Sequence, residues 1–304
     1  LACDLIARTA FAPTELTIRI KKTVFAVIRY FVLALAAISI LIPFLFVLSS
    51  SLKVNSGNGL NSIYHVPVTW FFPDPQFENY AYVFLRTNIL QAFGNTLLYI
   101  VPTIGLGCFC SCAAAYAFAK LRFPGKNVIF MCLLATMMLP GILTMIPSYI
   151  LMSNVYKWSG TPLPIMVPGM FGSVSAIFFL RQFIVKLPSS LEDAARIDGM
   201  SYGGIFLKII LPLAWPAIIT QAVLMINGMY NDYLGPLLYL NRNEELWTVQ
   251  LVIASNRFLI SQRNMHWPRL LAASVVVTVP MFVLFAAAQR YLVEGIAVSG
   301  LKES

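Results

Sequence analysis

A short polar segment at residues 188–199 holds the acidic side chains whose spacing points to a function. It carries Glu192, Asp193 and Asp198 against a single basic residue, Arg196. The cytoplasmic face of a membrane is itself negative, so a basic groove on another protein suits these carboxylates better than lipid headgroups do. We therefore interpret the segment as a docking site for a partner. A helix that lies on the lipid surface is the alternative.

Motifs of enzymatic chemistry do not occur in the sequence. A phosphate-binding loop needs Gly-x-x-x-x-Gly-Lys followed by Ser or Thr, but Gly125-Lys126 is followed by Asn127. The two histidines, His65 and His266, form no His-Glu-x-x-His pattern, and Gly-x-Ser-x-Gly does not occur. The five cysteines lack the spacing of a zinc site. We expect no catalytic residue, metal or cofactor on this chain, and no ATP hydrolysis by it.

The composition indicates what kind of molecule positions the polar segment. Hydrophobic residues make up 59% of the 304 residues and charged residues only 11%, whereas soluble proteins have about 25% charged residues. The mean hydropathy is +0.78. These values exclude a soluble globular domain, a disordered chain and a disulfide scaffold. An integral membrane protein remains.

Six uncharged stretches are long enough to cross a membrane as helices, which takes about 20 residues each. Their apolar runs are continuous and do not alternate, which favours helices over a membrane barrel. The stretches cover residues 30–52, 87–119, 127–156, 158–180, 209–231 and 270–289. We predict an all-α polytopic membrane bundle with six transmembrane helices.

The distribution of basic residues predicts the orientation, because cytoplasmic loops are enriched in Lys and Arg. Fourteen of the 21 Lys and Arg residues fall in the segments that include both termini and the loops after the second and fourth spans. We therefore place both termini in the cytoplasm. The net charge of +9 mostly reflects this asymmetry, and basic residues are not interleaved with aromatic ones as nucleic-acid binding requires.

The spans and charges together predict the organisation of the chain. It begins with a cytoplasmic N-terminal segment at 1–29, continues with a six-span domain at 30–293, and ends with a cytoplasmic tail at 294–304. Within the domain lie external loops at 53–86 and 233–269 and an internal loop at 188–212. The partly amphipathic stretch 246–259 is expected at the membrane interface or under a partner.

Local signals in the internal loop predict a short helix followed by a tight turn. Pro188 ends the preceding span. Ser190 can cap the new helix, and Asp193 completes a capping box with it. Gly199 suits the left-handed position after a helix, and Ser201 can cap the next helix. So short a helix is not stable alone in water, so it must pack on a surface.

The loop resembles a known motif. Asp193-Ala194-Ala195, three residues, Gly199, nine residues, Ile209, one residue and Leu211-Pro212 are similar to the EAA loop. That loop belongs to the membrane subunits of binding-protein-dependent ABC importers. The rest of the chain resembles the smaller six-span partner of maltose-type carbohydrate permeases. The matching segments are Ser51-Leu52-Lys53, Glu78-Asn79-Tyr80, Ala115-Tyr116-Ala117-Phe118-Ala119, Phe123-Pro124-Gly125-Lys126, Leu180-Arg181-Gln182-Phe183, Asn231-Asp232-Tyr233-Leu234 and Gln289-Arg290-Tyr291. Two departures are Asp193 for the family's usual Glu and Tyr230 for a frequent Trp.

The resemblance implies the fold of an ABC type I importer permease and a role for the loop. The short helix would sit in a cleft on a cytoplasmic ATPase, where Asp193, with Glu192, would pair with a basic residue and Ala194 and Ala195 would allow close approach. ATP-driven closure of the ATPases would then move the loop and switch the spans from inward-open to outward-open. The implied ATPase-coupling set is Glu192, Asp193, Ala194, Ala195, Asp198, Gly199, Ile209, Leu211 and Pro212.

The resemblance also implies the partners and the location. The chain would lie in the inner membrane with a second homologous permease, two ATPases that hold ATP and Mg, and an extracytoplasmic solute-binding protein. The solute would be an oligosaccharide or a related sugar. The tail at 294–304 is a secondary candidate for contact with the ATPases.

The outer end of the fifth span holds the candidates for a substrate path. Asn227, Tyr230 and Asp232 lie there, in contact with substrate or with the partner permease. For Asp232 a hydrogen bond at a helix end is the alternative. An ion-coupled secondary transporter is the rival function, but such proteins place ionisable residues near the membrane midplane, and the six spans contain almost none.

Overall fold

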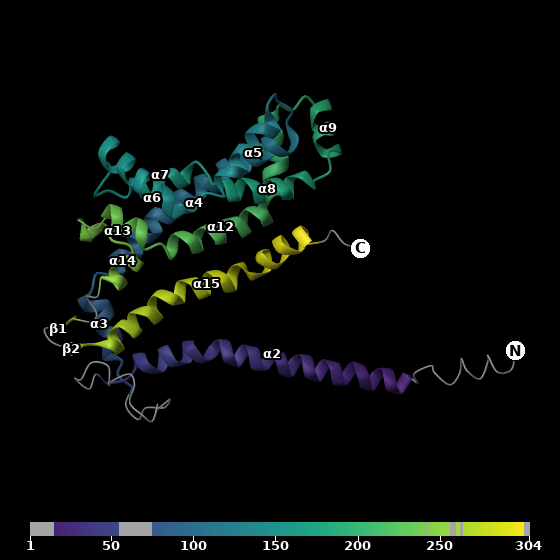
Figure 1. Cartoon of the computed structure of the whole chain (residues 1–304). Helices are drawn as coiled ribbons and strands as arrows, with labels where there is room; N and C mark the ends of the chain where they lie inside the picture. The colour runs from purple at the N-terminus through teal and green to yellow at the C-terminus, as the bar shows by residue number, and fades with distance from the viewer. Residues whose placement is uncertain (1–14, 55–74, 241, 256–259, 262–263, 301–304) are drawn as a thin grey trace, which may run out of the picture.

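The computed structural model describes residues 15–54, 75–240, 242–255, 260–261 and 264–300. Over these residues the chain is an elongated bundle of helices with one short two-stranded ribbon (Figure 1). The longest helices are α2 (Glu15–Ser51), α4 (Ile89–Lys120) and α15 (Trp267–Gly300). Each contains a stretch apolar and long enough to cross a membrane. A fourth such stretch combines α7 (Leu163–Met170) and α8 (Val174–Val185).

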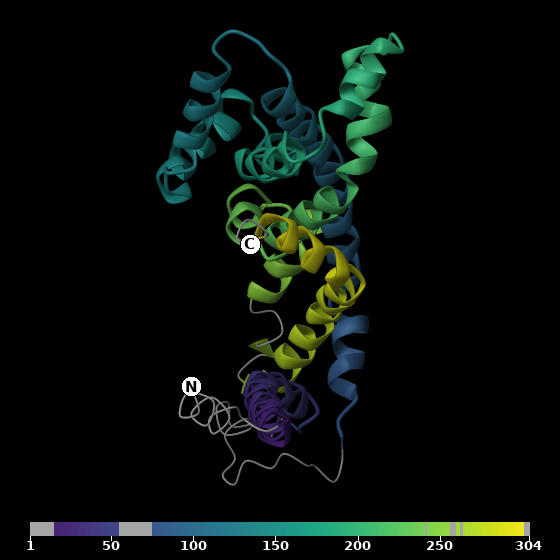
Figure 2. The same ribbon diagram turned by 90° about the vertical axis from the view of Figure 1, so that its right-hand side faces the viewer.

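Two more spans are bent pairs of helices. α5 (Lys126–Thr136) meets α6 (Gly141–Ile150) and the π-helical turn η2 (Leu151–Val155) at 94°. Figure 2 shows this pair standing to one side of the bundle. The second pair joins α10 (Tyr202–Ile205), η3 (Phe206–Ile210) and α11 (Leu211–Leu213) to α12 (Trp215–Tyr230) at 74°. With each bent pair counted as one span, the predicted six-span helical bundle is confirmed.

Prolines explain where the two spans bend. Pro140 directly precedes α6, and a proline lacks the N–H that would continue a helix from α5. In the other pair, Pro212 and Pro216 lie in the first turns of α11 and α12, where a missing N–H costs nothing. The sequence thus places helix starts at these prolines, and each preceding segment ends just before them.

α4 is the central helix, and it packs on α7, α8 and α12. Its contact with the α7–α8 segment is lined by small side chains. A Cβ added at Gly169 would lie 2.6 Å from the Thr103 methyl, and one at Gly172 would lie 2.5 Å from the Ser111 hydroxyl. Such a seam lets two backbones approach closely, which is how helices associate in membranes without a hydrophobic driving force.

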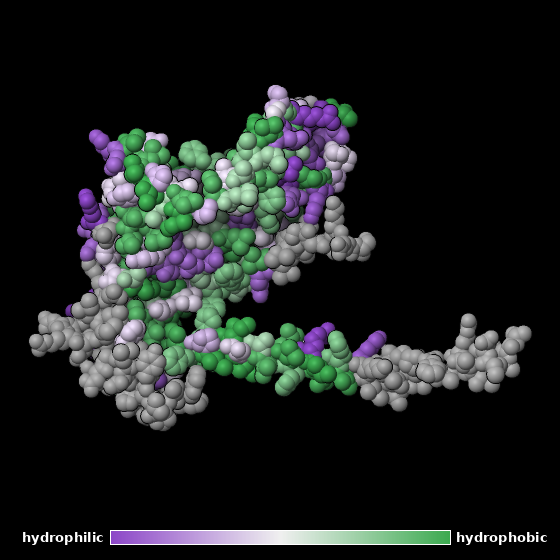
Figure 3. All heavy atoms as spheres, in the orientation of Figure 1, coloured by the Kyte–Doolittle hydropathy of each residue, from purple (hydrophilic) through white to green (hydrophobic). Residues whose placement is uncertain are grey.

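α2 is held to the rest of the chain mainly through α15, and its C-terminal end also bonds to α3 (Glu78–Arg86). The Asn79 side chain donates to the backbone oxygens of Ser51 and Lys53, at 2.9 and 3.1 Å. The hydroxyls of Ser51 and Tyr80 lie 2.6 Å apart. Two of the sequence motifs, residues 51–53 and 78–80, therefore meet at this corner. From Val24 to Leu48, α2 exposes many apolar side chains, seen as green in Figure 3, as expected for a helix in lipid.

The end of the bundle that holds α3 is capped by short elements. They are α13 (Leu234–Leu240), the 3-10 turn η4 (Glu244–Leu246), α14 (Val249–Ala254) and the antiparallel strands β1 (Ile260–Ser261) and β2 (Asn264–Met265), with Ile260 opposite Met265. The Val249 N–H donates to the Thr96 hydroxyl of α4 at 3.0 Å, and Val249, Leu251 and Val252 are buried. The apolar face of α14 therefore covers α4 of the same chain. That 246–259 lies at the interface or under a partner stays a prediction, and residues 256–259 lie outside the described residues.

One end of the molecule, on the right of Figure 1, holds the N-terminal end of α2, the C-terminal end of α15 and the helix α9 (Ser190–Ile197). α3, α13 and α14 lie at the other end. The helix boundaries differ from the predicted segments: α2 already includes residues 15–29, and α15 continues through residues 294–300. Residues 1–14 and 301–304, and most of the external loop at 53–86, lie outside the described residues.

Candidate functional site

The internal loop forms the predicted short helix α9, with a correction at its start. Ser189, not Ser190, is the N-cap residue, and it makes no side-chain capping hydrogen bond. The predicted capping box is absent because Ser189 already has helical angles (φ −68°, ψ −24°), whereas a capping side chain needs an extended backbone. Ser201 has that extended backbone, and its hydroxyl accepts from the Gly204 N–H at 3.3 Å, as predicted.

The turn after α9 is the one expected from the sequence. Gly199 has φ +78°, in the left-handed region that side chains with a Cβ rarely adopt. Its N–H donates to the Arg196 oxygen at 3.0 Å, and the Met200 N–H donates to the Ala195 oxygen at 2.9 Å. These bonds satisfy carbonyls that the end of a helix leaves free. The turn therefore holds α9 and α10 at a fixed angle.

α9 has one face on its own chain and one face to the outside. Glu192 and Ala195 are 4% and 5% exposed and point into the bundle. Asp193, Ala194 and Arg196 are exposed, and Ile197 is 87% exposed. Of the two neighbouring carboxylates, only Asp193 is therefore available to a partner in this conformation. Asp198 is exposed just after the helix.

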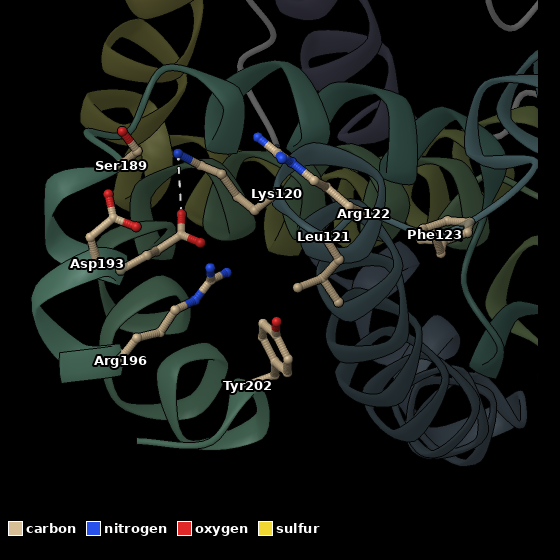
Figure 4. Close-up of a pocket in the computed structure, with 9 residues that line it drawn as sticks. Lys120, Leu121, Arg122, Phe123, Ser189, Asp193, Arg196 and Tyr202 are labelled. Carbon is tan, nitrogen blue, oxygen red and sulfur yellow. Dashed lines mark ion pairs between the residues drawn. The ribbon is translucent and has the colours of Figure 1, made fainter. Parts of the chain in front are cut away.

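The inward face of α9 is tied to the end of α4. The Lys120 ammonium lies 3.2 Å from a carboxylate oxygen of Glu192, and it also donates to the Leu187 backbone oxygen at 2.6 Å. Figure 4 shows the pair between the two helices. Sequence reasoning missed Lys120 as the partner of Glu192. A signal was present, because Lys120 is the first cation after an apolar span and the loop at 188–199 is acidic.

Two more cations hold the end of α4. Lys126 donates to the Leu121 oxygen at 2.9 Å, and the Arg181 Nε donates to the Phe118 oxygen at 3.1 Å. Cations are favoured at this end of a helix, where carbonyls lack partners. The Arg181 guanidinium also lies 4.3 Å from the Phe130 ring centre. The sequence motifs around residues 118, 126 and 181 thus meet at one place, beside α9.

A polar pocket of about 580 Å³ opens between α9 and the loop after α4. Lys120, Arg122, Asp193, Arg196 and Tyr202 line much of it, as Figure 4 shows. Hydrophilic side chains dominate this corner of the molecule, purple in Figure 3. Charges of both signs suit contact with a charged protein surface. Over the described residues, His, Cys, Asp and Glu form no group able to hold a metal ion.

The segment after the turn connects α9 to the fifth span. Ile209 and Leu211 are half-buried, while Pro212 is exposed. The buried contacts come from residues that the motif did not single out, Phe206 and Ile210. The Phe206 ring stacks on Tyr116 of α4, with ring centres 5.7 Å apart. The apolar spacing of positions 206 and 210, one helical turn apart, was the available signal.

The predicted substrate-path residues separate into two groups. The Asn231 amide donates to the Asn227 side-chain oxygen at 2.9 Å and accepts from Gln250 at 3.4 Å. These three amides form a row between α12 and α14, and Asn231 is exposed. Sequence reasoning predicted only Asn227 of the three. It missed Asn231 and Gln250, because nothing local in the sequence pairs Gln250 with α12. We call these three residues the amide row.

Tyr230 and Asp232 have structural partners instead. Tyr230 is 5% exposed, and its hydroxyl donates to the Val277 oxygen of α15 at 2.6 Å. The Asp232 carboxylate accepts from the Gly235 N–H at 3.1 Å, at the start of α13. Asp232 therefore makes the hydrogen bond at a helix end that was the alternative to a contact with substrate. Both residues support the C-terminal end of α12.

Comparison with known proteins identifies related chains. Residues 103–298 match the family described as "Binding-protein-dependent transport system inner membrane component". The Arabinooligosaccharides transport system permease protein AraQ of Halalkalibacterium halodurans is 33% identical over 226 residues, which cover 74% of this chain and 79% of that protein. The Diacetylchitobiose uptake system permease protein NgcG of Streptomyces coelicolor is 30% identical over 267 residues, which cover 88% and 85%.

A solved structure has the same fold. It is a bacterial ABC transporter involved in the import of the acidic polysaccharide alginate, and one of its chains superposes with a TM-score of 0.75. The superposition covers 89% of this chain and 97% of that chain at 22% identity. At this identity the likeness concerns the fold.

Proposed function

This chain belongs to the family of inner-membrane components of binding-protein-dependent transport systems, and we propose that it forms part of the path for an oligosaccharide in an ATP-driven importer. Family membership makes it a multi-pass membrane permease and does not favour the ion-coupled secondary transporter. The partners we propose are a second homologous permease, two ATPases that bind ATP and Mg, and an extracytoplasmic solute-binding protein.

The observation that carries this proposal is the two-faced helix α9. One face is fixed on the chain through Glu192 and Ala195, so the helix is not free to fold away. The other face presents Asp193, Ala194 and Ile197 at an end of the bundle. Ile197 is 87% exposed and lies one helical turn from Asp193, so this face offers an apolar and a charged side chain together to a partner. We propose that this face docks on the ATPase.

Each residue of the coupling set then has a role. Asp193 pairs with a basic residue of the ATPase, and Ala194 permits close approach of the backbone. Gly199 and Asp198 form the turn that directs α10. Ile209, Leu211 and Pro212 connect that turn to the fifth span. Glu192 and Ala195 act from inside the chain by holding α9.

The sugar path is the second part of the proposal. The relatives AraQ and NgcG carry the names of oligosaccharide systems. Amide side chains both donate and accept hydrogen bonds, which matches the hydroxyls of a sugar. We assign this contact to the amide row of Asn227, Asn231 and Gln250, at the outer end of α12. Tyr230 and Asp232 support that end from behind.

The orientation follows from the charges. Lys120, Arg122 and Arg196 line the pocket beside α9, and Lys126 and Arg181 bind backbone oxygens at the same end of α4. The N-terminal end of α2 and the C-terminal end of α15 also lie at this end of the bundle. We propose that this end faces the cytoplasm and that both termini lie there. The end with α3, α13 and α14 would face the solute-binding protein.

A pull-down of the tagged chain from its native membrane in mild detergent tests this function. Mass spectrometry is expected to find an ATPase and a second permease. Asp193→Lys should reduce the recovered ATPase, because it reverses the exposed charge, whereas Lys157→Gln, at a position away from α9, should not. Recovery of the chain alone, with uptake driven by an ion gradient without ATP, would contradict the proposal.

A further inference from the structure

The helix α9 needs an anchor if it is to transmit movement. A helix of 8 residues is too short to be stable by itself. Docking on a second protein would move the spans only if α9 keeps its angle to them. The contact that can fix this angle is therefore part of the coupling machinery, although it lies on the face away from any partner.

The Lys120–Glu192 ion pair has the properties of such an anchor. The two side chains are 12% and 5% exposed, and their charged atoms lie 3.2 Å apart. A charge this deeply buried is costly without its partner. The pair also joins two elements that are 72 positions apart in the sequence: Lys120 is the last residue of α4, the central helix of the bundle, and Glu192 lies in the first turn of α9.

Lys120 binds the segment that precedes α9 as well as α9 itself. Its ammonium donates to the Leu187 oxygen at 2.6 Å, just before Pro188 and the start of α9. The end of α4 that carries Lys120 is itself held, because Lys126 and Arg181 bind the oxygens of Leu121 and Phe118. A force on α9 is thus passed directly to α4.

We propose that Lys120 is a positioning residue for coupling: through Glu192 and Leu187 it makes α9 and α4 move as one body. This extends, and rests on, the docking of α9 proposed above. The contacts of α4 with α7, α8 and α12 then carry that movement to these three helices. Lys120 itself makes no contact with the ATPase in this account.

The test measures sugar transported per ATP hydrolysed by the complete importer in liposomes. Lys120→Gln and Glu192→Gln each leave one buried charge or polar group without its partner, and each should lower this ratio about tenfold or more. The combined exchange Lys120→Glu with Glu192→Lys restores an ion pair and should restore most of the ratio. Lys208→Gln, which removes an exposed lysine on the same side, should leave it unchanged.

A covalent bridge gives a second measurement in case the exchanged pair does not assemble. Lys120→Cys with Glu192→Cys is made in a background in which the five native cysteines are replaced by alanine. A short bifunctional thiol reagent that joins the two positions should raise the ratio above that of the unbridged variant. If bridging instead abolishes transport, α9 must separate from α4 during the cycle, and the inference is overturned.

The outcomes separate this inference from the proposed function. If the unmodified chain recovers no ATPase, both fail together. If the ATPase is recovered and Asp193→Lys weakens its binding, but the single Lys120 and Glu192 variants behave like Lys208→Gln, only the positioning role is wrong. A ratio that falls in the single variants and returns in the exchanged pair supports it, because a merely unfolded loop would not be rescued by exchange.

Discussion

Gly107 of α4 faces the backbone oxygen of Gly169 in α7 so closely that no side chain fits between them. A Cβ at Gly107 would also lie 3.2 Å from the terminal methyl group of Met225 in α12. The contact joins the central helix to the fourth and fifth spans. If α4 carries movement from α9, this seam passes it on.

Gly107→Ala should therefore destabilise the protein by about 1–3 kcal/mol, because the added methyl group forces the α4 and α7 backbones apart. Gly105→Ala is the matched control on the same helix, since a Cβ there meets nothing within 4 Å. Alanine favours helix formation, so the control should be neutral or slightly stabilising. Apparent unfolding temperatures of the purified chains in detergent compare the two. Equal shifts would show that the seam is not tightly packed.

Substitutions at Gly199 should separate backbone strain from steric conflict. A Cβ at this glycine meets nothing within 4 Å, so the cost of Gly199→Ala comes only from φ +78° and should be about 1–2 kcal/mol. Gly199→Asn should cost less, because asparagine tolerates this region. Gly199→Pro should abolish coupled transport, since it cannot adopt a positive φ and removes the N–H that binds Arg196.

The measurement is sugar uptake and ATPase activity in the assembled importer. The expected order of remaining uptake is Asn above Ala above Pro, with the spans inserted in every variant. Normal coupled uptake by Gly199→Pro would mean that the turn after α9 is not needed in this shape.

Asn79→Leu should loosen α2. The side chain is 8% exposed and donates to the oxygens of Ser51 and Lys53, so the variant leaves those carbonyls without this donor at a cost of about 1–3 kcal/mol. Glu78→Gln, at the exposed neighbouring position, is the control. Thermal unfolding in detergent should show a loss for Asn79→Leu alone. The same stability for both variants would mean that α2 is held by its contact with α15.

The amide row predicts an effect on sugar affinity. Asn231→Leu and Gln250→Leu each remove hydrogen-bonding groups, and each should raise the sugar concentration for half-maximal uptake about 2- to 10-fold. Asn127→Leu, an exposed asparagine at the opposite end, should not change it. If both amide variants keep the same half-maximal sugar concentration, the amide row does not contact the sugar.

Tyr230→Phe offers a contrast to those variants. It loses only the bond to the Val277 oxygen, which is buried between α12 and α15. Its expected effect is a loss of about 1 kcal/mol in stability, with sugar affinity retained. A change in affinity at normal stability would return Tyr230 to the substrate path.

Much of the fold could be predicted from the sequence because membrane helices satisfy their own backbone hydrogen bonds. Long uncharged runs therefore predicted the spans, and the short helix at 190–197 followed from local turn chemistry. The angles at which the third and fifth spans bend could not be predicted from the sequence. Pro140 and Pro216 interrupt a helix, but the angle at each break depends on what the two halves pack against.

The sequence by itself determined that this chain is a polytopic membrane protein with a polar loop that turns at Gly199, because length, hydropathy and backbone preference are properties of the local sequence. Only the tertiary structure decided which side chains of that loop face outward. Glu192 and Asp193 are adjacent and chemically alike, yet one is buried on Lys120 and the other exposed. The physical reason is that successive helix positions point in different directions, and which direction meets the bundle depends on a residue 72 positions away.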